Sequence, residues 1–397
     1  MKKCTLLFCW ALFLSIGIYA QDPVPVGLEI IGTPLTSGTL PMTATGQEVW
    51  GDYNNDGFID MFITAGQGST SAALYKNNGD QTFTEVTTVI DKLGYSSAMF
   101  FDYNNDGNLD ILVAGSTDGT FTSVVTRLFK NSGAPDFSYS LDAGSSFVGI
   151  SAGGGDNNTR MLETVDYNND GWQDIFISGD AGSTWAVSGT NRVVALYKNN
   201  QGTFELQVTP VGGTSNFVSI NGSGIHCGDV NNDGFADMIV SGYLDGTVNT
   251  VTDLYINDGN GGFSSYADSR TVFKGHLQGE TFFSDVNNDG WMDIIEIGRD
   301  VNNGWNGIAN LFINNKNLTF TLSDANANGL IGGGAVVGVD DINNDGKVDF
   351  AASGWGPMTS FFYNKGDNTF LAQAVDPDFS IRSNFVSFAP PATAGSI

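Results

Sequence analysis

Asp52-Tyr53-Asn54-Asn55-Asp56-Gly57-Phe58-Ile59-Asp60 is the stretch that decides the fold of this 397-residue chain. The same pattern, Asp-x-Asn-Asn-Asp-Gly-x-x-Asp, occurs six times, starting at Asp52, Asp102, Asp166, Asp229, Asp285 and Asp341. We number these nine-residue segments loops 1 to 6. They recur every 50 to 64 residues, and a motif with such a period predicts a repeat architecture.

Each loop has the oxygen donors that calcium prefers. Calcium takes about six to eight oxygens from carboxylates, amides and a backbone carbonyl. In loop 1 the ligands at positions 1, 3, 5, 7 and 9 would be Asp52, Asn54, Asp56, the carbonyl of Phe58, and Asp60. The start resembles an EF-hand loop, but position 12 is Ile63 in place of the bidentate Glu, and the flanking residues are strand-like. We therefore predict a calcium loop between two strands.

The other five loops keep every proposed ligand, so we expect up to six Ca²⁺ ions. Their residues are Asp102, Asn104, Asp106, Asn108 and Asp110; Asp166, Asn168, Asp170, Trp172 and Asp174; Asp229, Asn231, Asp233, Phe235 and Asp237; Asp285, Asn287, Asp289, Trp291 and Asp293; and Asp341, Asn343, Asp345, Lys347 and Asp349. A plain Asn-Asp-Gly turn is the alternative. It does not explain carboxylates at positions 1 and 9 in all copies. Magnesium is disfavoured because it prefers a rigid octahedron with retained waters.

A second signature follows each loop and completes a four-stranded unit. In the first repeat it reads Leu74-Tyr75-Lys76-Asn77-Asn78-Gly79 and resumes with Thr82-Phe83. An apolar strand that ends in Asn and Gly and then resumes predicts a hairpin. In the second repeat we expect strands at 98–101, 109–114, 124–130 and 137–141. Four antiparallel strands per repeat are typical of a β-propeller blade, and no helical periodicity is evident.

The paired motifs resemble the FG-GAP/VCBS repeats of the integrin α-subunit N-terminal β-propeller and of seven-bladed fungal lectins. The resemblance covers residues 22–397. It implies an all-β propeller of four-stranded antiparallel blades, with calcium loops between the first and second strands and ligands on the opposite face or between blades. The chain departs from the integrin pattern because all six loops are intact and the integrin's appended modules and large insertions are lacking. An integrin-type heterodimer is therefore not expected.

Closure of the ring has two possible solutions. Residues 27–35 resemble a fourth strand without a blade, and residues 383–388 resemble a first strand. Residues 389–393 stand where a seventh calcium loop would begin, but they contain no carboxylate. Either six blades close with an irregular seam, or a seven-blade plan has an incomplete last blade whose two middle strands are missing. We favour the second solution.

The N-terminus predicts export. Residues 1–20 join two lysines to an apolar run and read as a signal peptide, which leaves residues 21–397 as a single propeller domain. The alternatives are a membrane anchor, for which 16 apolar residues are marginal, and lipidation at Cys9. After cleavage only Cys227 remains, which we expect to be a small buried hydrophobe, and no disulfide can form. We predict a secreted or cell-surface/periplasmic bacterial protein without a membrane span.

Charge argues against nucleic acid as a partner. The formal net charge is −27, and 18 of the 43 acidic residues are the Asp residues of the six loops. Much of the acidity is thus counter-charge for metal, and the remainder disfavours a polyanion. We expect a monomer.

The connections between second and third strands are the candidate ligand face. They contain aromatic residues among polar ones: Trp185, Tyr243, Trp305 beside Arg299, and Trp355. Aromatic faces surrounded by hydrogen-bonding side chains are typical of sugar sites. The alternative is that these residues only pack between blades.

Catalysis is not expected. The two histidines, His226 and His276, lie outside the repeated motifs, and we expect His276 to be a solvated loop residue. No Gly-x-Ser-x-Gly elbow or zinc-type His spacing is present. A lyase would need a base, for which the connections offer Arg160, Lys274 and Arg299.

Three functions follow, in order of preference. The first is a secreted calcium-binding propeller that acts as an adhesion module for extracellular protein or glycan. The second is a sugar-specific lectin, and the third is a calcium-dependent polysaccharide lyase or glycosidase.

Overall fold

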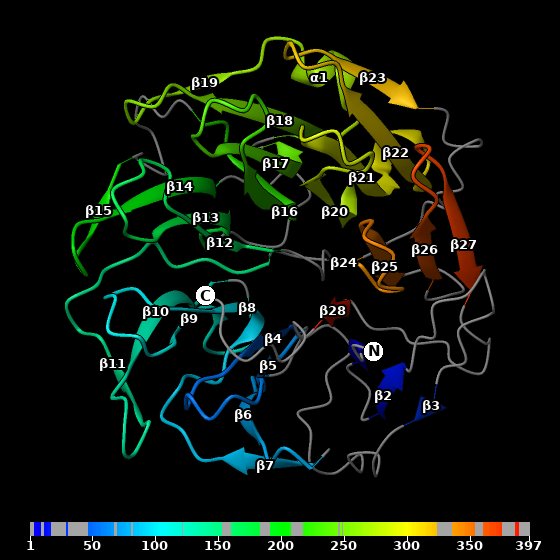
Figure 1. The fold of residues 1–397 in the computed structure, drawn as a ribbon. Helices are drawn as coiled ribbons and strands as arrows, with labels where there is room; N and C mark the ends of the chain where they lie inside the picture. The colour runs from blue at the N-terminus through cyan, green and yellow to red at the C-terminus, as the bar shows by residue number, and fades with distance from the viewer. Residues whose placement is uncertain are drawn as a thin grey trace.

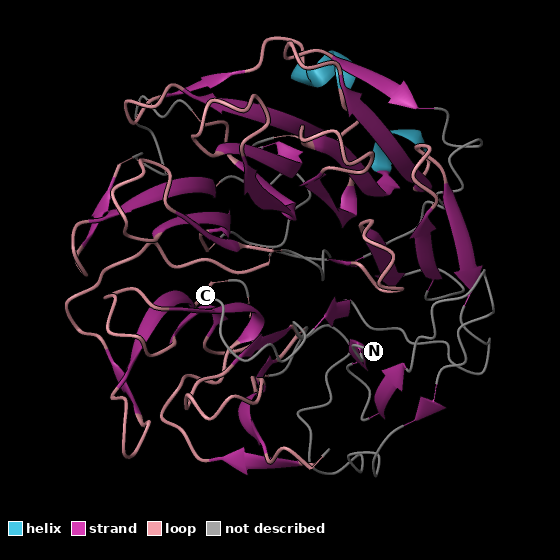
Figure 2. Ribbon diagram, viewed as in Figure 1, coloured by secondary structure: helices cyan, strands magenta, loops and turns pink. Residues whose placement is uncertain are grey.

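The chain folds into seven four-stranded antiparallel sheets arranged around a central axis (Figure 1). The computed structural model describes residues 4–8, 12–16, 29–30, 47–66, 70–80, 82–120, 122–152, 160–182, 191–207, 217–244, 247, 249–323, 336–353, 360–374 and 386–388. In this part of the chain the helices are α1 (Ser269–Val272) and the 3₁₀ turn η1 (Val301–Asn303), both in connections (Figure 2). The predicted all-β propeller is confirmed.

Six blades consist of consecutive strands, and the first strand of each faces the axis (Figure 1). Blade 1 contains β4 (Glu48–Gly51), β5 (Asp60–Thr64), β6 (Ala72–Asn77) and β7 (Phe83–Val86). Blade 2 contains β8 (Gly94–Phe101), β9 (Asp110–Ser116), β10 (Val124–Asn131) and β11 (Tyr139–Leu141). Blade 3 contains β12 (Leu162–Val165), β13 (Asp174–Asp180), β14 (Arg192–Asn199) and β15 (Phe204–Leu206).

The remaining consecutive blades have the same order. Blade 4 contains β16 (Ile220–Gly228), β17 (Asp237–Leu244), β18 (Thr250–Asn257) and β19 (Phe263–Ser265). Blade 5 contains β20 (Leu277–Ser284), β21 (Asp293–Asp300), β22 (Asn306–Asn314) and β23 (Phe320–Ser323). Blade 6 contains β24 (Val336–Asp340), β25 (Asp349–Ser353), β26 (Ser360–Asn364) and β27 (Phe370–Ala374).

The strands predicted for the second repeat are confirmed, with shifted ends. β8 starts four residues earlier than expected, at Gly94, and β9 runs to Ser116. β11 starts at Tyr139 and not at Phe137. The reason is local, because Phe137 has a φ of +45°, which is left-handed and cannot continue a strand.

Blade 7 joins the two ends of the chain. Its order is β28 (Val386–Phe388), β1 (Cys4–Phe8), β2 (Leu12–Ile16) and β3 (Glu29–Ile30). The expectation that its two middle strands are missing is wrong, because β1 pairs with β28 and β2 pairs with β3. β1 and β2 are formed by the apolar segment that also reads as a signal peptide. Cleavage of that segment stays a prediction.

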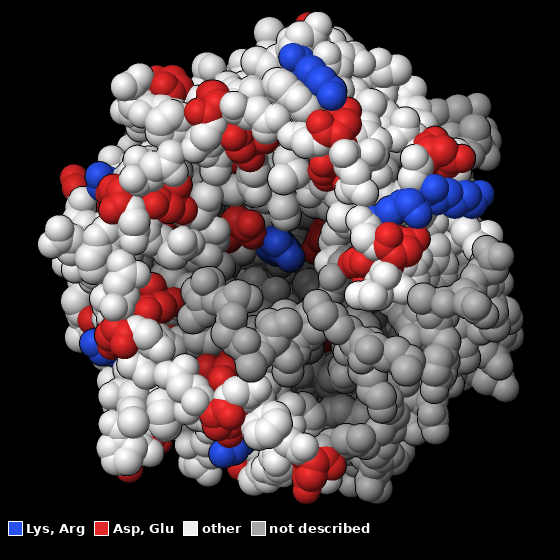
Figure 3. Space-filling view, in the orientation of Figure 1, with Lys and Arg blue, Asp and Glu red and all other residues white. Residues whose placement is uncertain are grey.

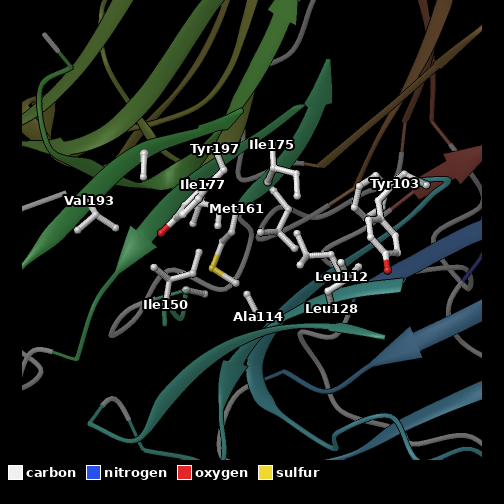
Figure 4. Close-up of a cluster of buried hydrophobic side chains, with 14 of the residues drawn as sticks. Tyr103, Leu112, Ala114, Leu128, Ile150, Met161, Ile175, Ile177, Val193 and Tyr197 are labelled. Atoms are coloured by element: carbon white, nitrogen blue, oxygen red, sulfur yellow. The ribbon is translucent and has the colours of Figure 1, made fainter. Parts of the chain in front are cut away.

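The hydrophobic core lies between the blades. Second strands such as β9 and β13 are buried at every residue, because a neighbouring blade covers each face. Figure 4 shows one such layer, in which Leu112 and Leu128 of blade 2 lie with Ile175 and Ile177 of blade 3. Each such side chain contributes about 1.5–3 kcal/mol when buried. The fold is therefore stabilised blade against blade.

In blades 2 to 6, the asparagine at the end of the third strand connects the blade to its predecessor. Asn199 of β14 donates from Nδ2 to the carbonyl oxygens of Gln173 in its own blade, at 3.0 Å, and of Tyr103 in loop 2, at 2.7 Å. Its Oδ1 accepts from Gly202 N. The same inter-blade bond is made by Asn131, Asn257, Asn314 and Asn364. The Asn199 side chain is therefore fully buried, and both its amide nitrogen and its amide oxygen are hydrogen-bonded.

Asn199→Ala should lower the free energy of unfolding by about 3 kcal/mol, since it leaves buried carbonyl groups without their donor. Asn200→Ala is the matched control, because the Asn200 side chain is exposed and donates a surface hydrogen bond to Glu205. It should change stability by about 0.5 kcal/mol or less. The measurement is urea unfolding at constant calcium concentration. Equal losses in the two variants would contradict this role of Asn199.

Candidate metal loops and ligand face

Each nine-residue loop is closed by bonds between its own backbone and side chains. In loop 1, Asp52 accepts from the backbone N of Asp56 at 3.0 Å and of Gly57 at 2.7 Å, and Asp56 accepts from Phe58 N at 3.0 Å. The other five loops repeat these contacts at 2.7–3.1 Å. The glycine at position 6 has a φ of +80° to +89°, which other residues resist.

The position-9 carboxylate is buried beneath the loop. In loop 1, Asp60 accepts from Tyr53 N at 3.1 Å and from Asn77 N at 2.7 Å, and it is fully buried. Burial, together with the nearby charges of Asp56 and Asp52, raises its pKa to about 7. The pKa of its equivalents is raised in the same way, to about 6 for Asp293 and about 7 for Asp110, Asp174, Asp237 and Asp349. Each loop therefore concentrates negative charge that a cation would offset.

Lysine side chains already pair with the position-5 carboxylate of five loops. Lys76 lies 3.0 Å from Asp56, and Lys130 and Lys198 make the same contact in loops 2 and 3. Lys316 and Lys347 replace them in loops 5 and 6. Asp233 of loop 4 forms no ion pair within the described residues and accepts from Asn231 Nδ2 instead. The sequence signal for the ion pairs of loops 1 to 3 is the recurring Lys in Leu-x-Lys-Asn, to which we had assigned no role.

Neighbouring loops are also bonded to each other. The asparagine at position 4 donates from Nδ2 to the carbonyl of the position-6 glycine in the next loop. The pairs are Asn55 with Gly107, Asn105 with Gly171, Asn169 with Gly234, Asn232 with Gly290, and Asn288 with Gly346, at 2.8–3.2 Å. From the sequence, position 4 has only a turn role, so this contact was missed.

The donor set fits a hard cation. Every loop offers carboxylate, amide and backbone carbonyl oxygens, which calcium prefers over nitrogen or sulfur. In the described part of the chain, however, no three His, Cys, Asp or Glu side chains are gathered as a metal cluster. A cation would have to draw the carboxylates of a loop together.

On the opposite face, two of the predicted ligand residues lie together. The Arg299 guanidinium lies 5.6 Å from the Trp305 ring centroid, and its Nε donates to the Trp305 carbonyl at 3.2 Å. Trp305 is 42% exposed. Tyr243 is buried, with Arg192 4.9 Å from its ring centroid. Trp185 and Trp355 lie outside the described residues.

A charged group lies near the axis, among the inner strands β12, β16 and β20. Arg160 pairs with Glu163 at 3.3 Å, and the carboxylates of Glu163 and Glu280 raise the Arg160 pKa against the effect of burial. Figure 3 shows basic and acidic side chains together in the central hollow. Burial, together with the Arg160 charge, lowers the pKa of the neighbouring His226 to about 3. Burial raises the pKa of the Cys227 thiol, so this free cysteine is a poor nucleophile.

His276 is not the solvated loop residue that we expected from the sequence. It is fully buried, and its Nε2 lies 2.7 Å from Thr281 Oγ1. Thr281 is hydrogen-bonded to Ser241, which is hydrogen-bonded to Thr252. Hydroxyl groups of blades 4 and 5 therefore form one network. Thr281 lies five residues after His276 in the same repeat, but Ser241 and Thr252 belong to the preceding blade, so spacing within one repeat does not reveal the network. A histidine enclosed in this way is positioned for structure and not for contact with a substrate.

The repeat family is visible in the sequence comparison. A family described as FG-GAP-like repeat matches residues 52–113, 102–177 and 166–240. Residues 52–240 of the chain therefore contain FG-GAP-like repeats. No curated protein matches the chain.

Among solved structures, this chain is similar to an Agrocybe aegerita lectin, described as specifically recognising non-reducing terminal N-acetylglucosamine. The TM-score is 0.61 at 18% identity, over 99% of this chain and 96% of the lectin. At that identity the likeness shows the propeller fold alone. None of the helices among the described residues has the length and apolar character needed to cross a membrane.

Burial of His276 predicts a specific loss of stability in acid. Its pKa is lowered from 6.5 to about 3, so the stabilisation is complete above pH 6.5 and is lost as the pH falls. Between pH 7.5 and 5 the loss should be about 2 kcal/mol. His276→Gln should lack this component. The measurement is the free energy of unfolding against pH for both proteins, and parallel curves would contradict the prediction.

Proposed function

We propose that this protein is a calcium-binding extracellular β-propeller that binds a glycan at the face opposite its nine-residue loops. FG-GAP repeats on a lectin-like propeller suggest a binding module. In an antiparallel blade, the connection between strands two and three lies at the end opposite the connection between strands one and two. The loops and the Trp305 face are therefore on different sides, which separates a stabilising role from a ligand-binding role.

Trp305 is the observation that carries the glycan proposal. A bulky residue with a φ of +64° is held in a strained conformation, and such strain is concentrated at functional sites. The strain does not serve core packing, because the indole remains exposed. Arg299 and Gln278, which are hydrogen-bonded to each other at 3.4 Å, add polar groups beside it. An apolar ring bordered by donors and acceptors suits the mixed faces of a sugar.

The first ligand class to test is a terminal N-acetylhexosamine. The lectin of similar fold is described as recognising N-acetylglucosamine, and this supports the choice without assigning the sugar.

Binding to a glycan array should be selective and should fall at least tenfold in Trp305→Gly. Glycine accepts the left-handed backbone, so this variant removes the indole without adding strain. Leu322→Ala is the control, since Leu322 is also exposed but lies on the outer strand β23. It should bind as the parent does.

Either of two results would refute the glycan proposal. One is that the folded protein binds no glycan on the array selectively, which would redirect the search to extracellular protein ligands. The other is equal loss in both variants, which would place the site elsewhere. Release of shortened oligosaccharides over time would indicate a lyase or glycosidase.

The calcium part of the proposal is supported by the oxygen donors of the six loops and by their concentrated charge. The lysines on the position-5 carboxylates show that these oxygens accept a cation. Calcium bound there would stabilise a chain in which Cys227 is the single cysteine outside the predicted signal peptide.

Calcium should raise the unfolding temperature of the protein, and EDTA should lower it. A single site at about 100 times its Kd contributes about 2.7 kcal/mol, and several sites add to that value. Magnesium at the same concentration should have a smaller effect, because it prefers a rigid octahedron with several retained waters over a shell of protein oxygens. The measurement is calorimetry with each ion. Identical melting curves in calcium and in EDTA would rule out the calcium proposal.

A further inference from the structure

The position-4 asparagines are used for something other than a turn. Five of them, Asn55, Asn105, Asn169, Asn232 and Asn288, have a φ between +54° and +56°. Glycine or asparagine adopts this conformation readily, but only asparagine also offers a side-chain amide. In every case that amide reaches the position-6 carbonyl of the following loop.

Each pair of neighbouring loops is also linked by a second hydrogen bond, which an asparagine of the later blade donates to the earlier loop. Between loops 4 and 5, Asn314 donates from Nδ2 to the carbonyl of Val230, at position 2 of loop 4, at 2.8 Å. The backbone N of the same Asn314 donates to Asp293, at position 9 of loop 5, at 2.8 Å. Loop 4 and loop 5 are thus linked by two bonds that both end beside proposed ligands.

These contacts connect the ordering of one loop to the ordering of the next. Asn232 lies between the proposed ligands Asn231 and Asp233 of loop 4. Gly290 lies between Asp289 and Trp291 of loop 5. A cation that fixes positions 3 and 5 of loop 4 also fixes the Asn232 amide, and this holds the turn of loop 5 in place. The second ion then has less conformational entropy to remove.

We propose that neighbouring loops bind calcium with positive coupling, and that the position-4 asparagines are the positioning residues that transmit it. The inference rests on the proposed calcium binding. The bonds of the position-4 asparagines are exposed, so removing one of them should weaken the adjacent site about three- to tenfold. Coupling is reciprocal, so either loop strengthens the other.

Trp291 makes loop 5 separately observable. It stands at position 7, so terbium bound in loop 5 should be sensitised by its indole. Trp50→Phe and Trp172→Phe would remove the tryptophans beside loops 1 and 3 and define the parent protein. Trp291→Phe in that parent should abolish most of the signal, which would assign it to loop 5.

A double-mutant cycle tests the coupling. Asp233→Asn disables loop 4, and Asn232→Gly cuts the link while keeping the left-handed backbone. In the parent, Asp233→Asn should raise the terbium concentration for half-saturation of loop 5 about three- to tenfold. Asn232→Gly should do the same, and the double variant should bind no more weakly than Asn232→Gly. Asn344→Gly, at position 4 of loop 6, is the control and should leave the effect of Asp233→Asn intact.

The outcomes separate the two proposals. If Asp233→Asn still shows terbium emission and the terbium concentration for half-saturation of loop 5 is unchanged, the coupling is overturned but calcium binding is not. An equal effect of Asp233→Asn with and without Asn232 would also overturn it. If no variant shows sensitised emission and calcium does not shift the melting curve, calcium binding itself fails and the coupling fails with it. Circular dichroism of each variant confirms that the propeller is folded.

Discussion

A buried carboxylate that accepts two backbone N–H groups is the interaction on which this propeller depends. The Asp at position 9 begins the second strand of each blade, bonds to the loop above it, and bonds to the asparagine that ends the third strand. That asparagine then reaches the preceding blade. Loop, blade and inter-blade contact are consequently one connected unit. A carboxylate in this position lacks water to stabilise its charge, and therefore the same interaction that organises the blade also makes it suited to a nearby cation.

The repeated unit could be predicted because its determinants are local. Glycine at position 6, aspartate at positions 1 and 9, and the Asn-Gly end of the third strand each have a steric or hydrogen-bonding reason within about thirty residues of sequence. Strand order and blade boundaries follow from them. The contacts that were missed are between repeats. Asn232 meets Gly290 across 58 residues, and Thr281, the partner of His276, meets Ser241 of blade 4, so no spacing within one repeat reveals these contacts.

The candidate ligand face was less predictable for the same reason. Arg299 lies near the end of β21 and Trp305 lies six residues later in the connection that follows, and the structure brings them together as the sequence suggested. Tyr243 looked equivalent in sequence. In the structure it is buried, and Arg192, which belongs to another blade, lies over its ring and donates to the Leu244 carbonyl beside it. Aromatic residues in propeller connections can therefore be sorted into packing and ligand contacts only when the neighbouring blade is known.

Blade 7 shows how one apolar segment can satisfy two physical roles. A middle strand covered on both faces reads as a continuous apolar run, and so does the central part of a signal peptide. Residues 4–8 and 12–16 take the place of middle strands by pairing with β28 and β3, and together with the preceding lysines their sequence also reads as a signal peptide. The two roles exclude each other in one molecule, because a cleaved leader cannot pair with β28. In the full chain the ring closes through these strands. After cleavage, the edges of blades 1 and 6 would have to be held by the remaining strands, and the bonds between successive loops would then carry more of the ring's cohesion.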